Sequence, residues 1–217
     1  VTIKNHLRKN KYNPKKLYNK SMFNVVDVGF NSIFLRANKD LLELLKSFNL
    51  EHNKLKKFIL KSENQIEKLY NEKKGVFTNY DIRNKKKIIV PSITNYFILF
   101  ADLKNQTINK KIIKNLKNHN QTKKYIFSSI KPNYKKFEEK RYWRGPVWIN
   151  CNWIIYQGLK NKDKNFANKI KEKTINLIKK NGFFEYYSFK TGKAFGASNF
   201  SWTASLFLDL VMEKKYN

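Results

Sequence analysis

The most informative stretch of the sequence is RYWRGPVWINCNW, residues 141–153. Its first eight residues hold two tryptophans, a tyrosine and two of the chain's five arginines. Aromatic rings stack on the apolar C–H faces of sugars, and arginine donates a rigid fork of hydrogen bonds to hydroxyls or carboxylates. The stretch therefore indicates either a sugar-binding loop or an aromatic core cluster at the start of a helix.

Two later segments share this concentration of aromatic side chains. In GFFEYY, residues 182–187, four aromatics flank the single carboxylate of Glu185. Enzymes tune general acids and bases by placing a carboxylate in such surroundings; the alternative is an exposed glutamate on a turn. The segment Gly192–Ala204 is expected to be a flexible loop that enters a helix, where Phe200 and Trp202 either line a pocket or fix the helix to the core. Its spacing is not that of a phosphate-binding loop.

Apolar residues elsewhere recur at helical spacing. About seven helices and almost no strand are expected, which favours a mostly α array of antiparallel helices. Short extended pieces are expected at 77–81 and 183–189, and a loop at 127–141. The helices are expected at Phe30–Phe48, Asn53–Tyr70, Pro91–Phe100, Ile108–Leu116, Pro146–Leu159, Asp163–Lys180 and Phe200–Lys214.

The three aromatic segments together resemble family 63 of the glycoside hydrolases. YWRGPVWINCNW (142–153) looks like the family's sugar-binding motif, and GFFEYY and FSWTA (200–204) look like two later motifs in the same order. Phe23–Leu41 resembles an earlier helix of the bacterial branch, which includes glucosylglycerate and mannosylglycerate hydrolases.

The resemblance implies an all-α fold, the (α/α)6 toroid of six-hairpin glycosidases. It implies hydrolysis of an α-glycoside with inversion: a small α-glucoside or α-mannoside such as a glycosylglycerate, or a terminal glucose of an oligosaccharide. Glu185 matches the general base, and no metal or organic cofactor is expected. The positions that match the sugar pocket are Tyr142, Trp143, Arg144, Gly145, Trp148, Tyr186 and Trp202.

The general acid of the family is an aspartate in a motif of the Met-Asp-Asn-Ser-Pro type, which this chain does not contain. Asp27 is early and acidic, but its context matches a later helix. Seven helices are also too few for a toroid of twelve. We therefore expect residues 22–217 to be the C-terminal part of a catalytic domain, and residues 1–21 an arm or the truncated start of a longer sequence. The acid and the rest of the domain would then lie upstream or on a second chain, and this chain alone would be inactive.

The net charge of +30 suggests a different class of function. A basic chain can bind nucleic acid, so the alternative is a non-catalytic basic helical module that binds carbohydrate or nucleic acid. However, 41 of the 46 basic residues are lysines, spread along the whole chain. Arginine is the usual reader of bases and phosphates, so we favour a solvated lysine-rich surface without specific nucleic-acid binding.

Cysteine and histidine usage restricts the remaining possibilities. The single cysteine, Cys151, allows no internal disulfide, and there is no His/Cys cluster for zinc. His6, His52 and His119 are expected at the surface. No apolar run approaches a membrane span, and the first residues lack the apolar core of a signal peptide. A cytoplasmic protein is the expectation.

Overall fold

A computed structural model describes residues 3–21, 23–119 and 126–213 of the chain. The expected mostly helical architecture is confirmed, and the described residues also form short antiparallel strand pairs. The elements are α1 (Ile3–Lys9), α2 (Pro14–Lys20), β1 (Val25–Val26), α3 (Val28–Ser47), α4 (Asn53–Glu67), β2 (Tyr70–Asn71), β3 (Val76–Phe77), β4 (Asn79–Asp81), β5 (Lys86–Ile88), the 3-10 helix η1 (Ile93–Tyr96), α5 (Ile98–Ala101), α6 (Gln106–His119), α7 (Ile149–Leu159), α8 (Lys164–Asn181), β6 (Phe184–Tyr187), β7 (Ala194–Ser198) and α9 (Ser201–Met212).

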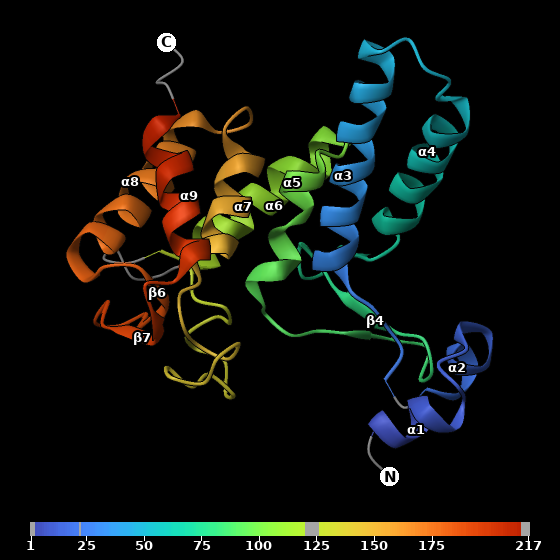
Figure 1. Cartoon of the computed structure of the whole chain (residues 1–217), viewed down its shortest axis with the longest axis horizontal. Helices are drawn as coiled ribbons and strands as arrows, with labels where there is room; N and C mark the ends of the chain where they lie inside the picture. The colour runs from blue at the N-terminus through green and yellow to red at the C-terminus, as the bar shows by residue number, and fades with distance from the viewer. Residues whose placement is uncertain (1–2, 22, 120–125, 214–217) are drawn as a thin grey trace.

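The helices form a row in which α3, α5, α7 and α9 each contact the next (Figure 1). Helix α4 packs on α3 on the side away from α5, and α8 packs on both α7 and α9. The core runs along this row and holds the fully buried side chains Leu99, Ile112, Ile155 and Leu159. Gly158 allows α7 to approach α5 closely, because a Cβ at that position would lie 2.6 Å from the backbone nitrogen of Phe100.

Helix α3 begins at a residue with the side chain of a typical N-cap. The Asp27 carboxylate accepts a hydrogen bond from the Phe30 N–H at 2.7 Å and another from the Asn79 side chain at 3.0 Å. The helix ends before Asn49, which has a φ of 54° that asparagine tolerates. Asp27 is thus a capping residue that joins α3 to the small β1–β4–β5 sheet.

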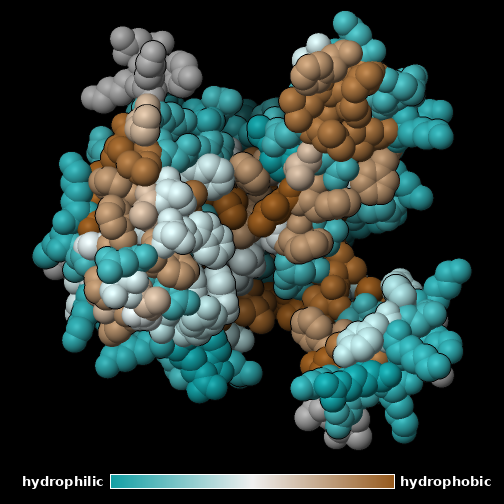
Figure 2. All heavy atoms as spheres, in the orientation of Figure 1, coloured by the Kyte–Doolittle hydropathy of each residue, from teal (hydrophilic) through white to brown (hydrophobic). Residues whose placement is uncertain are grey.

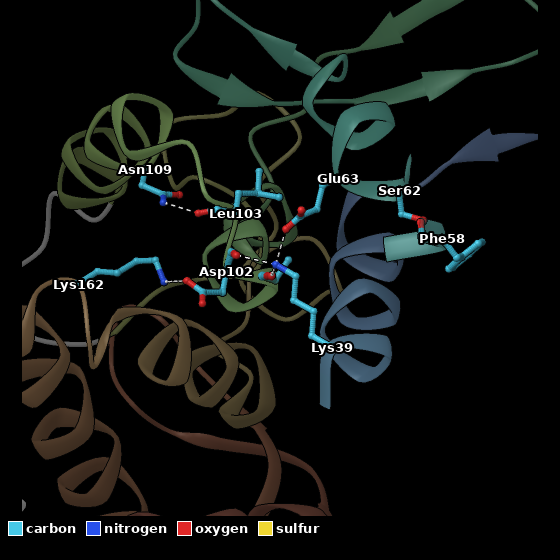
Figure 3. A network of polar contacts seen from close by, with 9 residues as sticks. Lys39, Phe58, Ser62, Glu63, Asp102, Leu103, Asn109 and Lys162 are labelled. Atoms are coloured by element: carbon cyan, nitrogen blue, oxygen red, sulfur yellow. Dashed lines mark hydrogen bonds and ion pairs between the residues drawn. The ribbon is translucent and has the colours of Figure 1, made fainter. Parts of the chain in front are cut away.

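A buried ion pair joins three helices (Figure 3). The Lys39 ammonium on α3 lies 2.5 Å from a carboxylate oxygen of Glu63 on α4. It also donates to the backbone carbonyls of Ala101 at 2.9 Å and Asp102 at 2.6 Å, at the end of α5. Glu63 is only 6% exposed, so Lys39 takes the place of solvent as the partner of its carboxylate.

Several sequence-based expectations about local structure are wrong. The segment expected to be helical from Pro146 becomes helical only at Ile149, because Val147 pairs with Tyr187 in an isolated bridge. The segment after Pro91 is a 3-10 turn followed by a single turn of α-helix. The flexible loop expected in 192–204 contains strand β7, and the described residues form seven short strands rather than almost none. Of the helix expected at Phe200–Lys214, residues Ser201–Met212 are helical and Lys214 lies outside the described residues.

The prediction that His119 lies at the surface is also wrong. It is 2% exposed and its ring packs edge-on against Tyr96 and Phe127, with centroids 5.3 and 6.1 Å away. Burial, assisted by the charge of Lys131, lowers its pKa to about 4. Cys151 is buried as well, and burial raises the pKa of its thiol to about 12.

Residues Ile3–Lys9 and Pro14–Lys20 form two short helices, and none of the residues described in α1 is buried. Among the described helices, none combines the length and apolar character needed to cross a bilayer.

Candidate active site

Glu185 lies in β6, which pairs antiparallel with β7. Phe184 is opposite Ser198 and Tyr186 is opposite Phe195, so two residues of β7 face the single residue Glu185. This arrangement is a β-bulge, a distortion that redirects side chains beside many active sites. The Glu185 side chain is half-buried.

Two neutral donors hold the Glu185 carboxylate. The Tyr142 hydroxyl donates to Oε1 at 2.9 Å, and the Ala197 N–H donates to Oε2 at 3.3 Å. The hydrogen bond to Glu185, with a contribution from burial, raises the pKa of Tyr142 above its ordinary value, and the phenol is a donor at neutral pH. Within the described ranges, no lysine or arginine forms an ion pair with Glu185. The carboxylate is therefore positioned without being neutralised.

An aromatic cluster lies next to this carboxylate. The rings of Trp143 and Trp148 stack at 4.2 Å with an interplanar angle of 9°, and Tyr186 stacks on Trp148 at 5.1 Å. Tyr142 meets Trp148 edge-on at 4.8 Å. Trp148 is 2% exposed, whereas Trp143 is 44% exposed, so the cluster has a buried base and an open face. Such a face suits the stacking of a sugar ring.

Backbone pairing brings the aromatic loop to β6. The N–H of Val147 donates to the carbonyl of Tyr187 at 2.8 Å, and the reciprocal bond is 3.0 Å long. The Trp148 indole N–H donates to the carbonyl of Tyr142 at 2.9 Å, which fixes the loop over its own helix start. Gly145 is buried, and its N–H donates to the Ser129 hydroxyl at 2.9 Å.

Arg144 is engaged by a neighbour in the same loop. Its guanidinium pairs with the Glu138 carboxylate, and the Glu138 N–H donates to the Arg144 carbonyl at 2.7 Å. The next residue, Glu139, accepts from the Ser188 hydroxyl and from the Lys190 N–H, which joins the loop to the turn between β6 and β7. These two glutamates were not singled out from the sequence.

The third motif reaches β6 from the start of α9. The Thr203 hydroxyl donates to the Phe184 carbonyl at 2.7 Å, and the Phe200 N–H donates to the Phe183 carbonyl at 3.0 Å. Trp202 is 47% exposed, and the ring contacts found among the described residues do not include it. The fold thus gathers all three motifs at one end of the helix row, with Trp202 at the edge.

The side chains of Tyr142 and Trp143 beside Glu185 are 47% and 44% exposed. Two cavities, of about 720 and 540 Å³, lie along α3 and α4, and Glu185 lines neither of them. The two hydrogen-bond donors and the aromatic face converge at Glu185. No group of three or more potential metal ligands occurs in the described parts of the chain.

Comparison with known proteins gives a consistent result. Residues 2–203 match the model of the mannosylglycerate hydrolase MGH1-like glycoside hydrolase domain. A mannosylglycerate hydrolase of Thermus thermophilus is 34% identical over 204 residues, which are 93% of this chain and 49% of that protein. A glucosylglycerate hydrolase of Mycolicibacterium hassiacum is 24% identical over 208 residues, 92% of this chain and 47% of that protein.

A crystal structure of a GH63 mannosylglycerate hydrolase from Thermus thermophilus in complex with glucose has a TM-score of 0.90 to this chain. The identity is 31%, and the match covers 97% of this chain and 53% of that one. This likeness confirms the predicted fold class, an all-α chain forming part of a toroid of helical hairpins. The chain spans about half the length of the curated relatives it matches.

Proposed function

The chain belongs to the mannosylglycerate hydrolase MGH1-like glycoside hydrolase family, as its resemblance to family 63 predicted, and on that premise we propose that it is the C-terminal part of a catalytic domain that hydrolyses an α-glycoside with inversion. The observation that carries the proposal is the Glu185 carboxylate, held by Tyr142 and Ala197 beside an open aromatic face.

Glu185 is the general base of this proposal. In an inverting reaction, one carboxylate removes a proton from the attacking water while a carboxylic acid protonates the leaving oxygen on the other face of the sugar. Neutral donors leave the Glu185 charge available to accept that proton, whereas an ion pair with lysine would stabilise the charged form further. Trp143 and Tyr142, which are 44% and 47% exposed, offer the sugar a surface for stacking.

The general acid is supplied by a segment upstream of this chain or by a second polypeptide. The nearby Glu138 and Glu139 are occupied by Arg144 and by Ser188, and Asp27 caps α3. The acid must lie about 6.5–9.5 Å from Glu185 to leave room for the water. On this proposal the chain alone is inactive.

Exposed apolar faces support a partner that completes the domain. Apolar side chains gather over the upper end of α3 in Figure 2. On this helix Phe30 and Leu44 are 71% and 56% exposed, Phe48 at its C-terminal end is 71% exposed, and at the other end of the row Met212 of α9 is 75% exposed. Monomeric proteins rarely leave such faces uncovered. We infer that the remaining helices of the domain cover α3 and α9, in cis or from a second chain.

A glycosylglycerate is the proposed substrate, because the curated relatives compared above are named as mannosylglycerate and glucosylglycerate hydrolases. The test is hydrolysis of mannosylglycerate and glucosylglycerate by the complete protein, with the anomer of the released sugar followed by NMR. Initial release of the β-anomer from an α-glycoside supports the proposal. Release of the α-anomer would contradict inversion, and absence of hydrolysis of any α-glycoside would contradict the enzyme itself.

The net charge of +30 favours one alternative, a basic module that holds nucleic acid. Hydrophilic residues are spread over much of the face seen in Figure 2 rather than drawn into one stripe, which suits a solvated surface. Binding through phosphates would fall steeply with salt. A titration with RNA and DNA at low and high salt decides this, and no binding at low salt excludes the alternative.

A further inference from the structure

Strand β7 contains a glycine at the point where it faces Glu185. Gly196 and Ala197 together oppose Glu185, and Gly196 has a φ of 75°, in the left-handed region. A glycine in that conformation is the usual first residue of one type of bulge, because it carries no Cβ to clash. This positive φ alone would account for a glycine at position 196, because any other residue would strain the backbone there.

The space around Gly196 adds a second and independent restriction. A Cβ on Gly196 would lie 2.5 Å from Oε2 of Glu185 and 2.7 Å from the Cβ of Glu185. It would also lie 2.9 Å from a ring carbon of Tyr186. All three distances are shorter than normal van der Waals contacts, so the Glu185 carboxylate occupies the space that a side chain at position 196 would need.

The next residue supplies one of the two hydrogen bonds to the carboxylate. At the bulge, the Ala197 N–H donates a hydrogen bond to Oε2 of Glu185 at 3.3 Å. The Tyr142 hydroxyl, from the aromatic loop, donates to Oε1. The carboxylate is therefore fixed between a side chain from the aromatic loop and the backbone of β7. Displacement toward Tyr142 or away from it would break one of these contacts.

We propose that the Gly196–Ala197 bulge is a positioning device for the general base, in which Gly196 acts through Glu185. The inference rests on the proposed function of Glu185. Gly196 is a positioning residue: it lets the carboxylate lie against the β7 backbone, where Ala197 and Tyr142 orient it toward water. A displacement of the order of 1 Å in a catalytic group lowers turnover by up to about 100-fold.

The test compares Gly196→Ala with Gly182→Ala in the complete protein. Gly182 has a similar φ of 82°, but the nearest neighbours of its added Cβ are ring atoms of Phe184 at ordinary distances of 3.6 and 3.8 Å. Both variants place a side chain on a residue with positive φ, so both should lose thermal stability, and thermal melting of each variant shows that the protein assayed is folded. Gly196→Ala should lower kcat by about 10- to 100-fold with KM changed less than about threefold, whereas Gly182→Ala should keep kcat within about twofold.

The same substitution is then made in a Glu185→Gln background. If Gly196 acts through Glu185, Gly196→Ala should lower the residual turnover less than about twofold there, because groups that act as a unit are not additive. Gly196→Asn serves where the alanine variant folds poorly, since asparagine tolerates a positive φ better and still brings a Cβ to the carboxylate.

Three results would overturn the inference. In the first, Gly196→Ala has the same kcat as Gly182→Ala. In the second, Gly196→Ala lowers turnover in the Glu185→Gln background as much as it does in the unchanged protein. Either result leaves Glu185 as the base and removes only the positioning role of Gly196. Normal turnover of Glu185→Gln alone would instead remove the proposed base, and the inference with it.

Discussion

Two glutamates of this chain are held in opposite ways. Glu63 is 6% exposed and is neutralised by Lys39, whose ammonium also ties two carbonyls at the end of α5 (Figure 3). Glu185 is half-buried at an open aromatic face and receives hydrogen bonds only from a phenol and a backbone N–H among the described residues. Both contacts fix a carboxylate in space.

The kind of partner distinguishes the structural carboxylate of Glu63 from Glu185, the proposed general base. The ammonium partner of a buried carboxylate compensates its charge, and losing that partner leaves the charge without compensation. A carboxylate held by neutral donors keeps its orientation but can still accept a proton. Its position beside solvent also gives water access to it.

Activity should distinguish the two kinds of glutamate most strongly. Glu185→Gln should lower kcat for the glycosylglycerate about 1,000-fold in the complete protein, because a general base contributes 10²–10⁴-fold. Its thermal stability should change little, since the amide keeps the shape and can still accept from Tyr142. The control Glu43→Gln alters an exposed glutamate whose ion pair with Lys46 lies at the surface, and it should leave kcat unchanged. Near-normal turnover of Glu185→Gln would contradict the proposed difference in role between Glu185 and Glu63.

The reverse experiment breaks the structural carboxylate. Lys39→Met should lower the free energy of unfolding by about 3 kcal/mol, because it leaves Glu63 buried and charged without a partner. Replacing both residues with apolar ones should recover most of that loss. Lys46→Met is the matched control, since its pair with Glu43 is exposed, and it should change stability by less than about 0.5 kcal/mol. Urea unfolding followed by tryptophan fluorescence measures all three, and equal losses in Lys39→Met and Lys46→Met would contradict the assignment.

His119 is a third case, a titratable group that is buried beside a like charge. Its pKa is lowered from 6.5 to about 4 by burial first and then by Lys131. Between pH 4 and pH 6.5, His119 is therefore protonated in the unfolded chain but neutral in the folded one. The contribution of the neutral ring is complete above pH 6.5 and is lost as pH falls toward 4, at most about 3 kcal/mol. The measurement is the free energy of unfolding at pH 7 and at pH 5, for the unchanged protein and for His119→Phe. The decrease from pH 7 to pH 5 should be smaller in His119→Phe than in the unchanged protein. An equal decrease in both would mean that His119 titrates normally.

The aromatic face beside Glu185 should give the most modest change. Trp143→Ala removes the exposed ring of the Trp143–Trp148 stack and should raise KM about 2- to 10-fold with a smaller change in kcat, because stacking contributes about 0.5–1.5 kcal/mol. Phe34→Ala is the control: Phe34 is 46% exposed like Trp143 but packs against Phe58 between α3 and α4, so stability should fall while KM stays constant. An unchanged KM in Trp143→Ala would make Trp143 a packing residue.

Contiguous sequence was sufficient for much of this structure. The helices expected from apolar spacing at Phe30–Phe48, Asn53–Tyr70 and Asp163–Lys180 are found at 28–47, 53–67 and 164–181. The three aromatic motifs indicated where to look for a site. The same periodicity did not show which helix faces would be buried: Leu41 and Leu44 belong to the apolar residues that recur at helical spacing in α3, yet they are 46% and 56% exposed.

Local pattern failed where a long-range contact decides the outcome. His119 stands in a polar stretch, yet the packing of Tyr96 and Phe127 buries it. Strand β7 shows no clear alternation of polar and apolar residues, and it forms because β6 pairs with it.

The family and the main helices could be inferred from the amino-acid order, because helical periodicity and contiguous motifs are properties of neighbouring residues, and the same motifs led to the prediction that Glu185 is the general base. The surroundings of that carboxylate could not be inferred. Tyr142 is 43 residues from Glu185 along the chain and Ala197 is 12. Their approach depends on the register of β6 against β7 and on the Val147–Tyr187 bridge, which are set by hydrogen bonds between segments distant in sequence.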